Sequence, residues 1–141
     1  MKKIVTAFLI TLLLAGCDAL DSPTDQATKI ALKGSWYVEF KDPSERRIKY
    51  LVNLVESRAF TAKQQVDGES QEESSSGVWH VTEGLLKLRT NEIAGRKLGT
   101  LDSAYLTCKL GEIGASEFSC EHGNEKFKLR FRRVPSDFKI Q

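Results

Sequence analysis

The side chains that could bind a metal ion are few, and the densest group of them is acidic. It lies between residues 67 and 77, in a serine-rich stretch with no large apolar residue. Its carboxylates are Asp67, Glu69, Glu72 and Glu73. Calcium takes oxygen ligands of this kind, but the spacing matches no calcium loop that can be justified mechanically. We therefore predict a hydrophilic loop and expect no metal site.

The histidines and serines form no catalytic pattern. His80 is out of phase with Trp79 and Val81, and His122 stands beside Gly123 near an expected turn. Neither histidine has a sequence neighbour that suggests a metal site or a triad. The chain also lacks a Gly-x-Ser-x-Gly motif. We expect no catalytic residue and no cofactor, and we predict that the protein is not an enzyme.

The N-terminal segment ends in a specific motif at Cys17. Lys2 and Lys3 precede an apolar run from Ile4 to Leu14, and the letters LAGC occupy residues 14–17. The run is shorter than the roughly 20 residues that a spanning helix needs. The segment resembles a bacterial lipoprotein signal, in which the cysteine thiol receives a diacylglyceryl group and cleavage before it exposes an amine that is then acylated. The resemblance implies that the mature chain begins at Cys17 and is held on the membrane by its lipid.

The residue after the cysteine bears on location. In enterobacterium-like lipoproteins an aspartate at this position, here Asp18, disfavours transfer to the outer membrane. The resemblance therefore implies the periplasmic side of the cell envelope. It favours the inner membrane and leaves the outer membrane as the alternative.

Charge and composition argue against a nucleic-acid partner. Without Lys2 and Lys3 of the signal, the basic residues equal the 19 acidic ones, so the mature chain has no global positive field. We divide the chain into a signal at 1–17, a flexible tether at 18–28 that contains Pro23, and one domain at 29–141.

The two remaining cysteines are predicted to form a disulfide, because an even pair in an oxidising compartment favours one. Cys108 and Cys120 lie symmetrically about Gly114 in a predicted hairpin, as do Leu110 and Phe118. Directly opposed positions place the two Cα atoms about 5.5 Å apart, which suits a disulfide.

Alternating hydrophobicity predicts an all-β domain. Trp36, Val38 and Phe40 share one face of the first strand, and Phe127, Leu129 and Phe131 share one face of the last. The expected strands are 34–41, 47–55, 58–66, 78–82, 85–89, 104–110, 117–122 and 126–134. At most one further short strand is expected in 90–103, and no convincing amphipathic helix is found. We predict a small antiparallel β-barrel or sandwich of about eight strands.

The Gly34-Ser35-Trp36 stretch resembles the Gly-x-Trp signature of lipocalin-like (calycin) barrels. Residues 77–79 and 84–88 resemble the central hairpin of such domains. The resemblance implies that a basic residue near the end of the last strand lies across Trp36, and Arg133 is the candidate. The chain is short for this family and lacks its long helix after the barrel.

Two functions remain open on the sequence alone. The favoured one is a protein-interaction module, which would act as an assembly factor, inhibitor or accessory factor of the envelope and would use loops or strand faces. The basic row on the last strand is a candidate face for it, although a solvated surface is the simpler interpretation; the row comprises Lys126, Lys128, Arg130 and Arg132. The alternative is a binder of a small apolar ligand or lipid, although in-phase tryptophans are more often core. Its candidate ligand-binding residues are Trp36, Phe40, Trp79, Leu88, Phe131 and Arg133.

Overall fold

The computed structural model describes residues 22–99, 104–122 and 127–141. In this part of the chain one helix is followed by nine strands. The helix is α1 (Pro23–Leu32). The strands are β1 (Gly34–Lys41), β2 (Arg47–Leu54), β3 (Ala59–Val66), β4 (Glu73–Thr82), β5 (Leu85–Ile93), β6 (Arg96–Lys97), β7 (Ala104–Ile113), β8 (Glu117–His122) and β9 (Phe127–Val134). Residues 100–103 of the uncertain stretch 90–103, and Lys126 of the last strand, lie outside the described residues.

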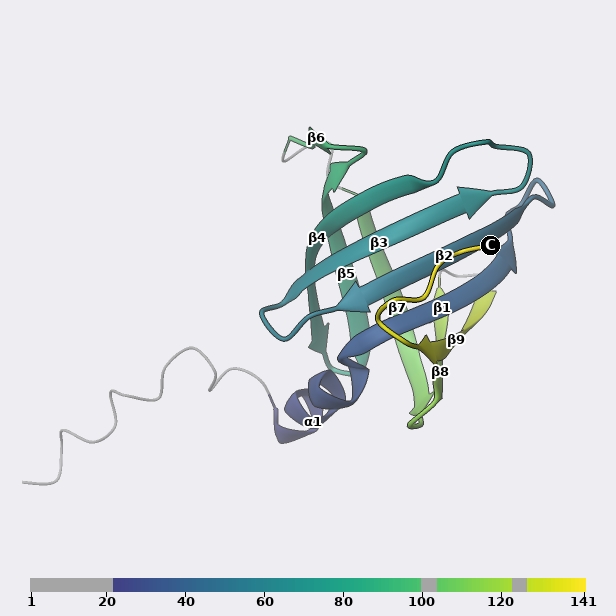
Figure 1. Ribbon diagram of the computed structural model, residues 1–141. Helices are drawn as coiled ribbons and strands as arrows, with labels where there is room; N and C mark the ends of the chain where they lie inside the picture. Colours follow the sequence, from purple (N-terminus) through teal and green to yellow (C-terminus); the bar gives the residue numbers. More distant parts are fainter. Residues whose placement is uncertain (1–21, 100–103, 123–126) are drawn as a thin grey trace, which may run out of the picture.

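Eight of the strands form a closed antiparallel barrel (Figure 1). Each strand pairs with its neighbours along the chain, β5 pairs with β7, and the pairing of β1 with β9 closes the ring. The two-residue β6 pairs only with the end of β5. Closure satisfies the backbone hydrogen bonds that an open sheet would leave at its edges. The predicted all-β fold is confirmed, and it is a barrel rather than a sandwich.

The β4–β5 hairpin forms where the sequence predicted it. Trp79 lies opposite Leu88, and Val81 lies opposite Leu86. Glu83 and Gly84 make the turn with φ angles of 52° and 75°. Two consecutive positive φ angles match the twist of the flanking strands, as in a type I′ turn.

The predicted loop 67–77 is too long. β4 begins at Glu73, and Gln64 of β3 lies opposite Glu73 while Ala62 lies opposite Ser75. A bulge follows between Ser76 and Gly77. A Cβ atom at Gly77 would lie 1.9 Å from the backbone oxygen of Arg89, so only glycine permits this approach of β4 to β5.

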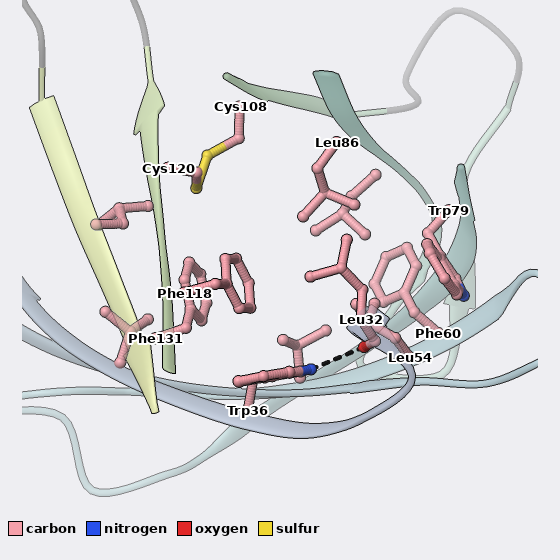
Figure 2. Close-up of a cluster of buried hydrophobic side chains, with 14 of the residues drawn as sticks. Leu32, Trp36, Leu54, Phe60, Trp79, Leu86, Cys108, Phe118, Cys120 and Phe131 are labelled. Atoms are coloured by element: carbon pink, nitrogen blue, oxygen red, sulfur yellow. Dashed lines mark hydrogen bonds between the residues drawn. A yellow bond between two sulfur atoms is a disulfide. The ribbon is translucent and has the colours of Figure 1, made fainter. Parts of the chain in front are cut away.

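Side chains fill the end of the barrel nearest α1 (Figure 2). Trp36 is fully buried, and its Nε1–H donates to the backbone oxygen of Leu32 at 2.8 Å. Its ring meets Phe118 edge-on at 4.7 Å, and Phe118 stacks on Phe131 at 4.7 Å. Full burial of each such side chain contributes about 1.5–3 kcal/mol. In the sequence, the members of the buried core cluster run from Leu32 to Phe131. The chain after Cys17 therefore contains the whole of this cluster.

The helix α1 covers the filled end (Figure 1). The side chain of Ser22 accepts a hydrogen bond from the Asp25 amide at 3.1 Å, and Pro23 occupies the first turn. Both residues are favoured where a helix begins. Residues 23–28, which we expected within the tether, are therefore helical; residues 18–21 lie outside the described part.

The buried side chains of Leu32 and Asp25 attach α1 to the barrel. Leu32 is completely buried in the core. Asp25 is 8% exposed, and its Oδ2 accepts a hydrogen bond from the Glu83 amide at 3.1 Å. The helix is thereby attached both to the interior and to the β4–β5 turn.

Cys108 and Cys120 form the predicted disulfide, with Cα atoms 5.5 Å apart. The predicted register was wrong, however. Cys108 lies opposite His122, and Leu110 lies opposite Cys120. The register shifts between Leu110 and Ile113, so the strands do not pair symmetrically about Gly114. Both cysteines are buried in the core cluster.

The C-terminal segment 135–141 covers part of the outer surface of β1 (Figure 1). The rings of Tyr37 and Phe138 are 5.0 Å apart, and the guanidinium of Arg132 lies 4.8 Å from the Tyr37 ring. Tyr37 is therefore 6% exposed although it points away from the barrel interior.

Candidate functional site

The end of the barrel opposite α1 is hollow. A cavity of about 330 Å³ lies there, which we call the mouth cavity. Its lining comes from all eight barrel strands. The lining residues are Val38, Phe40, Tyr50, Gln64, Glu73, Ser75, Thr90, Ile93, Leu106, His122, Phe127, Leu129 and Phe131.

Strand register explains why these side chains share one cavity. Tyr50 lies opposite Val38, and Glu73 lies opposite Gln64, so the members of each pair are on the same face of the sheet. The bulge at Gly77 lets Ser75 lie opposite Ile93 beyond it. The polar residues of β3 and β4 are thus directed into the barrel, in phase with the apolar residues below them.

Tyr50 presents a hydroxyl group in this wall. Burial raises the pKa of Tyr50 to about 12, so the phenol remains protonated at neutral pH. No hydrogen bond to this hydroxyl is found among the described residues. The group is therefore available to a ligand both as a donor and as an acceptor.

His122 lies at the rim of the mouth cavity. Its Nδ1–H donates to the backbone oxygen of Thr107 at 2.9 Å, because a carbonyl oxygen can only accept. This hydrogen bond fixes the orientation of the ring and leaves Nε2 for another partner.

The charge of the cavity wall is negative. Glu73, which is exposed at the opening, contributes a carboxylate, and no lysine or arginine is among the described residues that line the cavity. The neighbouring carboxylate of Glu72 belongs to the outer surface, where it lies 3.6 Å from the Lys63 ammonium. Adjacent acidic residues therefore have different surroundings.

The structure separates the ligand-binding residues proposed from the sequence into three places. Phe40 and Phe131 line the mouth cavity. Trp36, Trp79 and Leu88 belong to the buried core below it. Arg133 lies at the closed end of the barrel, where it contacts α1 rather than the cavity.

Arg133 makes the contact that the lipocalin-like resemblance implied. Its guanidinium lies 4.2 Å from the centre of the Trp36 ring, which confirms this prediction. It also donates to the backbone oxygens of Ala31, Lys33 and Ala115 at 2.9, 2.7 and 2.8 Å. One side chain thereby joins the end of α1, the β7–β8 turn and the first strand.

Sequence reasoning missed most of the polar cavity residues. Gln64 and Thr90 gave no signal, and Glu73 was placed in a loop. Gln64 and Thr90 each lie two residues beyond an inward residue of the same strand, Ala62 on β3 and Leu88 on β5, so they also point inward. Gln64 stands between the buried Ala62 and Val66 in the same phase of β3, so counting that phase could have identified it.

Two other charged groups remain surface features. The register places Glu117 opposite Arg132 and Glu121 opposite Lys128, so acidic residues of β8 flank the basic row of β9. In the acidic stretch, Glu69 lies 3.9 Å from the Arg46 guanidinium. Among the described residues no group of three or more potential metal ligands occurs.

Comparison with known proteins concerns the N-terminal segment. Residues 1–17 match the family model of the prokaryotic membrane lipoprotein lipid attachment site. No curated protein matches the chain. The protein is thus a membrane-anchored lipoprotein of the cell envelope whose anchored domain is an eight-stranded β-barrel. No helix in the described ranges is long and apolar enough to span a membrane.

Proposed function

We propose that this lipoprotein is a non-enzymatic binding protein that holds a small, largely apolar ligand in the mouth cavity. The cavity volume of about 330 Å³ falls in the range of small-molecule sites, about 300–1,000 Å³. Its wall combines aromatic and aliphatic side chains with a few polar groups, as such sites do. The protein would act on the periplasmic side of the envelope, and Asp18 favours the inner membrane.

The observation that carries this proposal is the Tyr50 hydroxyl in the cavity wall. Among the described side chains only the Arg89 Nε is both buried and without a partner, so the Tyr50 hydroxyl is open to the space of the cavity. A ligand with a hydrogen-bonding group would pair with this hydroxyl, and its apolar part would cover Phe40, Leu106 and Phe131. A barrel filled by side chains at both ends would leave no such space.

The test uses the mature chain from residue 18, secreted with a cleavable signal in place of residues 1–17. N-phenylnaphthylamine is a neutral probe that fluoresces in apolar surroundings. We expect it to bind and to shift the NMR signals of Phe40, Tyr50 and Leu106, but not those around Leu32. Shifts confined to the α1 end, or no binding, would contradict the proposal.

A matched pair of variants adds a control. Leu106 lines the cavity and Tyr105 is 65% exposed, so alternation along β7 directs them to opposite faces. Leu106→Trp should fill the cavity and reduce probe binding, whereas Tyr105→Trp should leave it unchanged. A thermal denaturation curve for each variant separates loss of the cavity from loss of the fold.

A protein-interaction module is the second candidate, favoured by a strip on the outer surface. Val78, Arg89 and Tyr105 lie side by side across β4, β5 and β7, and Val78 and Tyr105 are 43% and 65% exposed. The Arg89 Nε is buried without a hydrogen-bond partner. Tyrosine and arginine often dominate binding energy at interfaces. A photo-crosslinker at residue 105 in cells should capture an envelope protein with an acidic surface; the same crosslinker at Thr107 is the control.

A further inference from the structure

We infer that the mouth cavity selects a ligand whose head group is a cationic ammonium carried on a short apolar chain. This inference rests on the proposed function, which it makes specific. The full negative charge in the wall belongs to Glu73, and no cationic lysine or arginine lines the cavity among the described residues. A carboxylate ligand would meet repulsion here, whereas an ammonium group would meet attraction.

The polar groups of the wall also favour a donor over an acceptor. Glu73 accepts through its carboxylate. His122 uses its Nδ1–H on the Thr107 carbonyl, and in its neutral form it presents Nε2 as an acceptor. Gln64 and Tyr50 offer oxygens that accept as well as groups that donate. Acceptors of this kind suit the N–H groups of an amine or the positive surface of a quaternary ammonium.

Two aromatic residues of the cavity wall lie on the far side of the barrel from the carboxylate. Phe40 and Phe127 meet edge-on at 5.9 Å, and Phe127 is 40% exposed at the rim. The strand order places β4, which carries Glu73, on the opposite side of the barrel from β1 and β9, which carry the two phenylalanines. A cation between them would have a carboxylate on one side and ring π-electrons on the other, and aromatic faces attract ammonium groups.

The described lysine and arginine side chains of β9 and β3 that neighbour the cavity wall lie on the outer surface. Lys128 and Arg130 alternate with Leu129, which lines the cavity, so they point away from it. On β3, Lys63 is next to the inward Gln64 and lies 3.6 Å from the outward Glu72. The negative wall is therefore not neutralised by its strand neighbours.

The test compares three probes with the same chain: octyltrimethylammonium, octanol and octanoate. Each is titrated by NMR against the mature chain from residue 18. We expect the ammonium to bind about fivefold more tightly than the alcohol and the carboxylate to bind weakest. Signals of Phe40 and Phe127 should move on binding.

Two neighbouring acidic residues supply the matched control. Glu73→Gln keeps the size of the side chain and removes the inward charge, so ammonium affinity should fall about fivefold while octanol affinity stays within about twofold. Glu72→Gln makes the same change on the outer surface and should alter neither. Phe127→Leu should weaken only the ammonium, by about threefold.

The outcomes separate the two proposals. Equal binding of the three probes, or tightest binding of octanoate, would overturn the cationic preference while ligand binding in the cavity stands. Equal effects of Glu73→Gln and Glu72→Gln would also overturn it, since a general surface-charge effect would then explain the preference. Failure of all three probes, and of the neutral fluorescent probe, would overturn the proposed function itself.

Discussion

The guanidinium of Arg133 lies 4.2 Å from the centre of the Trp36 ring while it donates to the backbone oxygens of Ala31 and Lys33. The same Trp36 donates to Leu32 between them. One residue of β9 thereby holds the end of α1 where the chain enters β1. Carbonyl groups at the end of a helix lack intrahelical partners, and these hydrogen bonds satisfy two of them.

Arg133→Ala should lower the free energy of unfolding by about 2–4 kcal/mol. It removes a cation–π contact worth about 0.5–2 kcal/mol and leaves three carbonyls without their donor. Urea denaturation followed by tryptophan fluorescence measures the loss. Arg130→Ala, on the outer surface of the same strand, should change the value by less than about 0.5 kcal/mol. Equal effects of the two substitutions would show that the stacked geometry adds no stability.

Gly34→Ala should destabilise the barrel through the same junction. Gly34 has a φ of 121°, and an added Cβ would lie 2.6 Å from Arg133 Nη1. The backbone conformation disfavours any side chain, and the contact adds a clash. We expect a loss of about 2 kcal/mol in the same denaturation assay. In the Gly34→Ala/Arg133→Ala double variant the clash is absent. The loss of stability of the double variant should therefore be smaller than the sum of the losses of the two single variants.

Hydrophobic alternation predicted the filled half of the barrel well and the hollow half poorly. Trp79, Val81, Leu86 and Leu88 alternate with polar residues because each inward position contacts a packed core. Toward the mouth, inward positions meet a cavity and carry Gln64, Glu73 and Thr90. The periodic signal therefore weakens where the mouth cavity begins.

Two further differences have local physical causes. α1 gave little signal because its buried residues are Asp25 and Leu32, and Ile30 is 67% exposed. A helix with one apolar contact lacks an amphipathic stripe. The β7–β8 register was missed because the strands shift between Leu110 and Ile113, and an irregularity of this kind leaves no hydrophobic pattern.

The disulfide should contribute about 3 kcal/mol to stability. Cys108 and Cys120 are 12 residues apart, and closing a loop of this length restricts the unfolded chain by about that amount in the chain-entropy model. Cys108→Ala/Cys120→Ala should show this loss in urea. Wild-type protein unfolded in reductant should match the double variant, apart from the buried sulfur atoms. If the double variant were as stable as the oxidised wild-type protein, the disulfide would not constrain the unfolded state.

Tyr50 should make the barrel less stable at alkaline pH. Its folded pKa is raised to about 12 from 10.0, so the folded state keeps its proton where the unfolded state has lost it. The stabilisation is complete below about pH 10 and is lost as the pH rises toward about 12. Between about pH 9 and 11 the unfolding free energy should fall by about 1 kcal/mol through this group. Tyr50→Phe should remove that part of the fall; an identical pH profile would assign it to other groups.

The lipid anchor should place the closed end of the barrel nearer the membrane than the mouth. Only residues 18–22 separate Cys17 from Pro23, where α1 begins, and this length of chain reaches at most about 20 Å. Ser116, in the β7–β8 turn beside Arg133, is at the closed end, whereas Ser44, in the β1–β2 turn, is at the mouth end. In the lipidated full chain on vesicles, a fluorophore at Ser116→Cys should transfer more energy to a lipid acceptor than one at Ser44→Cys. Equal transfer would mean that the barrel lies on its side, and greater transfer from residue 44 would place the mouth against the bilayer. The expected result leaves the mouth cavity open to ligands from the aqueous side.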